Sequence, residues 1–348
     1  MSNTNLYLIS GLIFPLTLSA ILVLRPVAAR MGLMAHPDAR KSHDGEIPLI
    51  GGLAIFLSIL TMQGVFDHLN FAYLLAAALI VVAGVADDYK DISVRARLIT
   101  EITAALIMVE WGNTEIKSLG NLLGFGEIRL GPFSIAFTVI AVVGGINAFN
   151  MIDGIDGLAG SLSLLVFIFL LVLGLLFDNA GLSMLCSNFI PAIVAFLLFN
   201  LRIPGRNKAS IFLGNAGSTL LGFTICWSII SVTQGEGRII SPVTVLWIIA
   251  VPLFDTVSIV IRRMRNRRSP FAADREHFHH IVLAAGHGVN QTLAIILLFS
   301  IILAIIGWAS DLVFKIPEWC MFYLFLGLFA LYHWGIYRAL ASYPLRNS

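Results

Sequence analysis

Residues 158–177 read LAGSLSLLVFIFLLVLGLLF, an unbroken block without a charged side chain. About 20 apolar residues in an α-helix are enough to cross the hydrocarbon core of a bilayer. A second block of this kind occupies residues 293–308. Because continuous apolar stretches of this length are not typical of water-soluble domains, the two blocks predict membrane-spanning helices.

The composition of the whole chain supports the same interpretation. Of the 348 residues, 58% are hydrophobic and 12% are charged, compared with about 45–50% and about 25% in an ordinary soluble domain. The formal net charge is +2 and the basic residues are scattered, so nothing favours binding to nucleic acid. Three cysteines, Cys186, Cys226 and Cys320, lie in apolar segments and are expected to be buried thiols rather than disulfide partners.

Apolar stretches bounded by charge, glycine or proline predict eleven spans and an all-α polytopic membrane protein. No internal repeat or linker is visible, so residues 1–348 are interpreted as one integral membrane domain. The first span is expected to be retained rather than cleaved as a signal peptide. The expected spans cover residues 6–25, 49–66, 71–86, 97–111, 132–149, 158–177, 184–201, 214–233, 243–261, 293–313 and 318–338.

The distribution of Lys and Arg between these spans predicts the orientation of the chain. Of 22 basic residues, only Lys117, Arg129, Arg238 and Lys315 fall in the gaps on one side. Lys and Arg in short loops remain in the cytoplasm. The N-terminus is therefore expected outside, in the periplasm, and the C-terminus inside, with cytoplasmic catalytic loops near residues 26–48, 87–97, 147–157, 202–213 and 262–292.

The first polar motif follows the third expected span. Asp87, Asp88 and Asp91 fall within five residues, and like charges one helical turn apart repel unless a cation joins them. One interpretation is a solvated helix end. The other is a site for Mg²⁺ and phosphate, because hard cations prefer carboxylate oxygens and because Arg95 and Arg97 follow closely.

A second motif places Asn147, Asn150, Asp153 and Asp156 at intervals of three residues at the end of a span. The alternative is a glycine-rich turn with incidental polar groups. Two amides and two carboxylates at a membrane boundary are costly, which favours function. The glycines that follow the two aspartates allow the backbone to approach a ligand closely.

A third motif, FLGNAGS at residues 212–218, opens another span. Glycines and a hydroxyl at a helix N-terminus suit an anion, but small residues also promote helix packing in membranes. Both explanations remain open from the sequence.

The fourth motif is SPFAADREHFHH at residues 269–280, in which three histidines fall within four residues. Zinc is the rival ligand, but nearby thiols and an HExxH pattern are lacking. Imidazole side chains beside Arg275 are suited to binding a diphosphate. Asp255, inside the ninth expected span, is either functional or paired within the bundle. Lys41 belongs to a basic stretch in the first cytoplasmic loop.

Taken in this order, the four motifs resemble the polyprenyl-phosphate N-acetylhexosamine-1-phosphate transferase superfamily over nearly the whole chain. The peptidoglycan branch of that family ends its loop with three adjacent histidines, whereas this chain has His277, Phe278, His279 and His280. This difference, together with residues 146–160 and 241–252, favours the N-acetylglucosamine branch.

The resemblance implies an enzyme that transfers N-acetylglucosamine 1-phosphate from UDP-N-acetylglucosamine to undecaprenyl phosphate and releases UMP. Such products begin the assembly of O-antigen and enterobacterial common antigen. It also implies a Mg²⁺ cofactor, with Mn²⁺ as a substitute, a homodimer, and a place in the bacterial inner membrane with the site facing the cytoplasm. Another UDP-N-acetylhexosamine as donor, or a lipid or solute transporter, are the alternative hypotheses.

The same resemblance implies roles for individual residues. The acidic residues expected at the catalytic centre are Asp87, Asp88, Asp153 and Asp156, with Asp87 as a base or orienting group. The expected metal ligands are Asp88, Asn150 and Asn215. The expected substrate-binding residues are Lys41, Asp91, Arg97, Asn147, Arg275, His277, His279 and His280.

One position departs from the family pattern. The family carries Gly-Asp-x-Gly-Ser, with an aspartate that binds the metal, where this chain has Asn215. An amide brings no charge to a divalent cation, and the substitution therefore predicts a weakly active or inactive chain.

Overall fold

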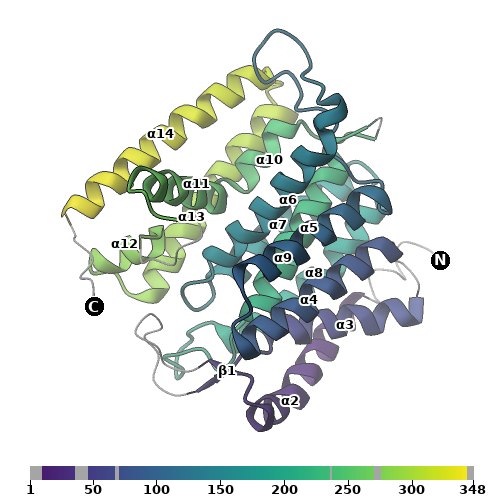
Figure 1. Ribbon diagram of the computed structural model, residues 1–348, viewed down its shortest axis with the longest axis vertical. Coiled ribbons are helices and arrows are strands. Elements are labelled where there is room, and N and C mark those ends of the chain that lie inside the picture. The colour runs from purple at the N-terminus through teal and green to yellow at the C-terminus, as the bar shows by residue number, and fades with distance from the viewer. Residues whose placement is uncertain (1–9, 36–45, 67–69, 236, 270–275, 343–348) are drawn as a thin grey trace.

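The computed structural model describes residues 10–35, 46–66, 70–235, 237–269 and 276–342, and these are almost entirely helical (Figure 1). All eleven expected segments contain helix. The long helices are α2 (Ile13–Met31), α3 (Gly51–Phe66), α4 (Phe71–Lys90), α5 (Val94–Glu110), α6 (Ser134–Met151), α7 (Leu158–Leu176), α8 (Ala180–Asn200), α9 (Gly214–Thr233), α11 (Ala250–Arg265), α13 (Val289–Leu312) and α14 (Glu318–Ser342). The shorter elements are the 3₁₀ turn η1 (Gly131–Phe133), α10 (Pro242–Ile248), α12 (Phe278–Ala284) and the strand pair β1 (Met34–Ala35) and β2 (Ile47–Pro48).

Fewer helices than expected are long and apolar enough to cross a membrane. Among the described residues there are eight, or up to nine if α10 and α11 together form one span. Two expected spans are too short to be counted among them, because the apolar part of α3 covers only Gly51–Gln63 and α5 has 17 residues. A polytopic helical membrane protein is therefore confirmed in outline, while the number of eleven spans and the orientation stay predictions.

The expected segment at residues 243–261 is not one continuous helix, and whether it crosses the membrane once stays a prediction. The segment is divided into α10 and α11, which meet at Ile249 with a bend of 84°. Pro252 lies in the first turn of α11 and lacks the N–H group that would continue the hydrogen-bonding ladder back to Ile248. A helix also interrupts the expected loop 262–292, because α12 begins at the histidine motif.

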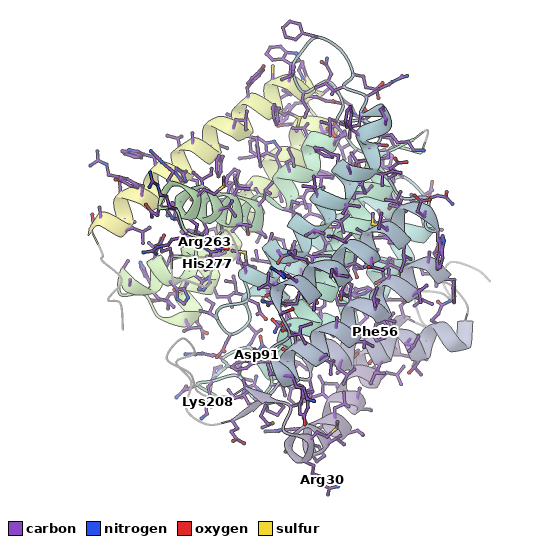
Figure 2. All side chains as sticks on the ribbon, in the orientation of Figure 1. Arg30, Phe56, Asp91, Lys208, Arg263 and His277 are labelled. Carbon is purple, nitrogen blue, oxygen red and sulfur yellow. The ribbon has the colours of Figure 1, made fainter. Side chains whose placement is uncertain are left out.

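Hydrogen bonds and ion pairs join several of the loops at two ends of the helix bundle. At one end the side chain of Gln234 accepts a hydrogen bond from the N–H of Ser118 at 3.0 Å, and Arg238 pairs with Glu318. These contacts join three of the five expected outside gaps, because Ser118 lies in gap 112–131, Gln234 and Arg238 lie in gap 234–242, and Glu318 directly follows gap 314–317. Figure 1 shows the 112–131 loop at the top, and Figure 2 shows Asp91 and Lys208 in the lower part of the view.

Contacts at the opposite end join the loops that were predicted to be cytoplasmic. The N–H of Gly51 donates to the carbonyl of Phe212, and the N–H of Phe212 donates to the carbonyl of Pro48. Asn290 donates to the carbonyl of Arg202. The first, fourth and fifth expected cytoplasmic loops therefore share one end of the molecule.

Helix α9 forms the centre of the bundle and packs against α3, α4, α6 and α7. Close approach at its first turn depends on small residues. A Cβ added to Gly52 would lie 2.1 Å from the N atom of Gly217, and one added to Gly84 would lie 2.3 Å from the Cα of Ala216. Helices in membranes associate closely through such residues. The start of α9 is thereby held against the end of α4, where the acidic motif lies.

Candidate active site

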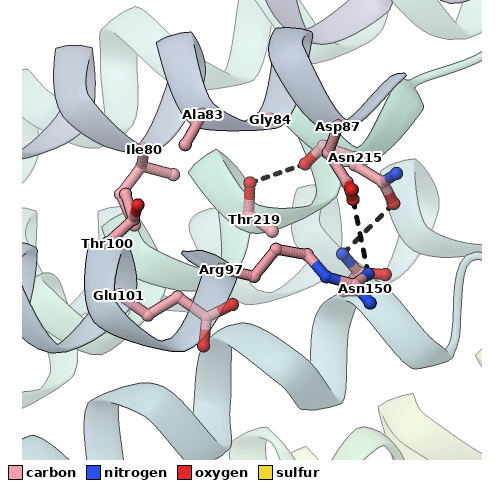
Figure 3. A pocket seen from close by; sticks show the side chains of 10 residues that line it. All are labelled: Ile80, Ala83, Gly84, Asp87, Arg97, Thr100, Glu101, Asn150, Asn215 and Thr219. Atoms are coloured by element: carbon pink, nitrogen blue, oxygen red, sulfur yellow. Dashed lines mark hydrogen bonds and ion pairs between the residues drawn. The ribbon is translucent and has the colours of Figure 1, made fainter. Parts of the chain in front are cut away.

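A polar pocket opens where α4, α5, α6 and α9 converge (Figure 3). It unites parts of the first three sequence motifs with the start of α5. The residues that line it are Ile80, Ala83, Gly84, Asp87, Arg97, Thr100, Glu101, Asn150, Asn215 and Thr219.

Asp87 and Arg97 form an ion pair in this pocket. The Arg97 Nη1 atom lies 3.3 Å from the Asp87 Oδ2 atom, and the Asp87 side chain is 4% exposed. A tight turn between α4 and α5 brings the two together. Asp91 ends α4 in the left-handed region with φ 47°, and Ser93 then caps the start of α5 by accepting the N–H of Ala96. Arg97 therefore contacts the acidic motif, while its expected role in holding a phosphate stays a prediction.

Glu101 is a pocket residue that the sequence interpretation missed. It lies one turn after Arg97 on α5, is 6% exposed, and accepts a hydrogen bond of 2.6 Å from the Asn147 side chain. An ionisable residue inside an apolar span is a functional candidate by default, and that signal was present in the expected span 97–111. Its effect is to place a second buried carboxylate beside Asp87.

Asn150 and Asn215 approach each other from α6 and α9. The Nδ2 atom of Asn150 donates to the Oδ1 atom of Asn215 at 3.4 Å, and both residues line the pocket with Asp87. Carboxylate and amide oxygens are the donors that Mg²⁺ prefers, so the chemistry of this set fits the ion. The described residues contain no group of three or more His, Cys, Asp or Glu side chains arranged for a metal. The fit therefore depends on the two amides.

Asp88 faces the N-terminus of α9. Its Oδ1 atom accepts the N–H of Asn215 at 2.8 Å and its Oδ2 atom accepts the N–H of Ala216 at 3.2 Å. Gly214, with φ 74°, allows this approach, because a Cβ there would lie 2.5 Å from Asp88 Oδ2. The small residues of the third motif pack closely, as its packing explanation expects. The amides at its start bind the carboxylate of Asp88, so binding of a substrate anion by this motif stays a prediction, as does the role of Asp88 as a metal ligand.

The two aspartates of the second motif lie outside the lining of this pocket. Asp156 pairs with Arg202, whose Nε atom lies 2.7 Å from Asp156 Oδ2, and the same oxygen accepts the N–H of Ala209. Asp156 therefore links the 201–213 loop to the turn between α6 and α7. Asp153 is exposed at the same end of the molecule. Their catalytic roles stay predictions.

The histidine motif contacts the second motif. The His279 ring is 1% exposed and lies against Gly154, where a Cβ would be 2.0 Å from its Nε2 atom. Within the described part of the chain, neither ring nitrogen of His279 has a hydrogen-bond partner. Burial, with smaller contributions from His280 and His277, lowers the pKa of His279 well below its usual value, so the ring is neutral at pH 7. Lys41 and Arg275 lie outside the described residues.

These features define a polytopic membrane protein with a polar site at one end of its helix bundle. Residues 70–233, which include the first three motifs, match the model of glycosyl transferase family 4. The chain is 44% identical over 334 residues to an undecaprenyl-phosphate alpha-N-acetylglucosaminyl 1-phosphate transferase of Salmonella typhi, covering 94% of this chain and 90% of the relative. The chain therefore belongs to glycosyl transferase family 4.

Other relatives carry the same name. Identity is 42% over 331 residues with the protein of Escherichia coli K12, covering 94% of this chain and 90% of the relative. It is 40% over 324 residues with the protein of Haemophilus influenzae, covering 92% and 90%. The resemblance inferred from the four motifs is confirmed.

Proposed function

We propose that this chain transfers N-acetylglucosamine 1-phosphate from UDP-N-acetylglucosamine to undecaprenyl phosphate. The observation that supports this most directly is the Asp87–Arg97 pair in a pocket with two amides at one end of a membrane bundle. The names of relatives that match over nearly the whole chain support the two substrates.

In the proposed reaction, an oxygen of the lipid phosphate attacks the donor phosphorus that carries the sugar. A new P–O–P bond forms, the bond between the two donor phosphates breaks, and UMP leaves with that electron pair. Both substrates are anionic, so positioning and charge neutralisation are the main requirements. Arg97 is 40% exposed at the pocket and supplies a guanidinium for a phosphate oxygen. Asp87 holds that guanidinium in place.

Mg²⁺, or Mn²⁺ as a substitute, belongs to this proposal. The residues that would hold the ion are Asp87, Asn150 and Asn215. Asp88 would support them, because its carboxylate accepts the N–H of Asn215. The ion would supply positive charge to phosphate oxygens as charge redistributes. Because only Asp87 in this set is a carboxylate that lines the pocket, Glu101 becomes important for the charge of the site.

The assay that tests the function uses purified protein, UDP-N-acetylglucosamine and undecaprenyl phosphate, and measures UMP together with the lipid product by mass spectrometry. UDP-N-acetylgalactosamine as donor tests the other donor hypothesis. Uptake of lipid or solute by proteoliposomes without UMP release would favour the transporter alternative and contradict the proposal.

The proposal also places the active site on the cytoplasmic face of a bacterial inner membrane, in a homodimer. The sidedness can be measured with single cysteines in intact cells, in a parent with its own cysteines replaced. Cysteines at Arg97 and at Lys208, which is exposed in the expected cytoplasmic loop 202–213, should react with an impermeant thiol reagent only after lysis, whereas those at Lys117 and Lys315 should react in intact cells. A mixed pattern within either pair would contradict the proposed topology.

We expect Glu101→Gln to reduce transfer about tenfold, equivalent to about 1.4 kcal/mol in the barrier. Glutamine can still accept the hydrogen bond from Asn147, so the fold should survive while the pocket loses one of its two buried carboxylates. Turnover and the Mg²⁺ concentration for half-maximal rate should both change. Glu110→Gln, at the exposed far end of the same helix, is the matched control. Equal rates and Mg²⁺ dependence in both variants would contradict a role for Glu101.

A further inference from the structure

Asp255 has no part in the mechanism above, although it is one of the most thoroughly hydrogen-bonded carboxylates of the described chain. It lies on α11, shortly after the bend, and is 2% exposed. Its Oδ2 atom lies 2.8 Å from the Nδ1 atom of His277. Its Oδ1 atom accepts the N–H of Phe278 at 2.9 Å and the hydroxyl of Tyr332 at 3.2 Å. The buried side chain of Asp255 thus binds both the start of α12 and the Tyr332 side chain of α14.

A second side chain of α11 binds the same segment. Arg262, two helical turns after Asp255 and therefore on the same face, donates from Nη2 to the carbonyl of Glu276 at 2.8 Å and from Nε to its carboxylate at 3.2 Å. Arg262 also donates to Ser258, which shares a hydrogen bond with His333 of α14. Residues 276–278 are consequently fixed to α11 by backbone and side-chain contacts.

The hydrogen bonds of Asp255 and Arg262 to residues 276–278 form an anchor that fixes the orientation of the histidine rings. The Nδ1 atom of His277 is hydrogen-bonded to the carboxylate of Asp255. The Nε2 atom is therefore the ring nitrogen that remains for a ligand. The rings of His277 and His279 are stacked, with centroids 5.5 Å apart and planes at 16°. Since His279 lies against Gly154, fixing His277 also fixes the packing of α12 on the second motif. Carboxylates that orient an imidazole through its other nitrogen commonly act in this way.

We propose that Asp255 is a positioning residue for the nucleotide-sugar donor. By holding His277 and the start of α12, it presents the His277 Nε2 atom to the diphosphate of the donor. The inference rests on the proposed function, because it takes the donor to be an anionic UDP-sugar. It predicts that Asp255 contributes to donor binding much more than to binding of the lipid acceptor.

The test compares Asp255→Asn with a matched control at the opposite end of the bundle. Asp311 is a half-buried carboxylate that also holds the start of a short helix, α10, because it accepts the N–H and hydroxyl of Ser241 and the hydroxyl of Thr244. Asp255→Asn should raise the donor KM about tenfold and leave the acceptor KM within twofold. Asp311→Asn should lower thermal stability comparably and leave both KM values within twofold.

A double-mutant cycle separates positioning from general destabilisation. In a His277→Asn background, Asp255→Asn should have little further effect on the donor KM, because the residue through which it acts is already gone. Additive effects, or an unchanged donor KM in Asp255→Asn, would overturn the proposal.

Hydrogen exchange provides a readout that does not depend on transfer. Amides of residues 277–280 should exchange faster in Asp255→Asn than in the parent and in Asp311→Asn. If exchange responds as expected but the parent neither binds nor consumes UDP-N-acetylglucosamine, the proposed function has failed while the anchor stands. Unchanged exchange would overturn the anchor itself.

Discussion

Replacement of Asp87 by asparagine is expected to reduce sugar-phosphate transfer at least a hundredfold. The side chain is 4% exposed, lines the pocket, and pairs with Arg97. Asparagine has nearly the same shape but no charge, so Arg97 loses the partner that orients it and the proposed cation site loses the carboxylate of Asp87. Loss of a preorganised charge at a phosphoryl-transfer site is worth about 3 kcal/mol, which corresponds to roughly a hundredfold in rate.

The measurement is UMP release at saturating donor and acceptor, accompanied by the thermal midpoint in detergent. Asp178→Asn is the matched control, because Asp178 is exposed in the turn between α7 and α8 and adopts a left-handed conformation that asparagine tolerates. Transfer by Asp87→Asn within a few-fold of the parent, with the control also active, would remove Asp87 from the catalytic centre.

The positions of most helices could be predicted because uncharged blocks such as 158–177 leave few alternatives in a membrane. The break at Ile249 could not, because hydropathy is continuous through residues 243–261 and Pro252 is compatible with a helix start as well as with a span. The two-residue strands at Met34 and Ile47 are too short to give a sequence period.

The site was only partly predictable from the sequence. Clusters of polar residues beside apolar spans indicated Asp87 and Asn150, the family resemblance indicated Asn215, and the fold brings these three to one pocket. Glu101 was overlooked because it stands alone rather than in a motif.

The partners of Asp88 and Asp156 depend on tertiary contacts between segments far apart in the chain. Asp88 accepts the N–H of Asn215, and Asp156 pairs with Arg202. No local pattern predicts such contacts. Motif spacing therefore identified the polar segments but not which carboxylates are engaged by the protein itself.

Asn215→Asp is expected to raise turnover about a hundredfold, by about 3 kcal/mol in the barrier, and to lower the Mg²⁺ concentration required. The residue lies in the first turn of α9, and its side-chain oxygen accepts a hydrogen bond from Asn150 at 3.4 Å. A carboxylate can keep that bond, and its charge is favourable near a helix N-terminus. Its backbone N–H continues to bind Asp88. The substitution therefore changes the charge offered to a cation while the surrounding contacts persist.

The double variant Asn215→Asp with Glu101→Gln shows whether the two positions supply the same charge. Both side chains line one pocket with Asp87, so a carboxylate at either position adds to the field that a divalent cation experiences there. If Glu101 partly substitutes for an acid at position 215, Glu101→Gln should reduce transfer less in the Asn215→Asp background than in the parent. Turnover and Mn²⁺ binding by electron paramagnetic resonance should change together across the four proteins. If the parent already matches the Asn215→Asp variant in rate and in Mg²⁺ dependence, position 215 does not act on the metal.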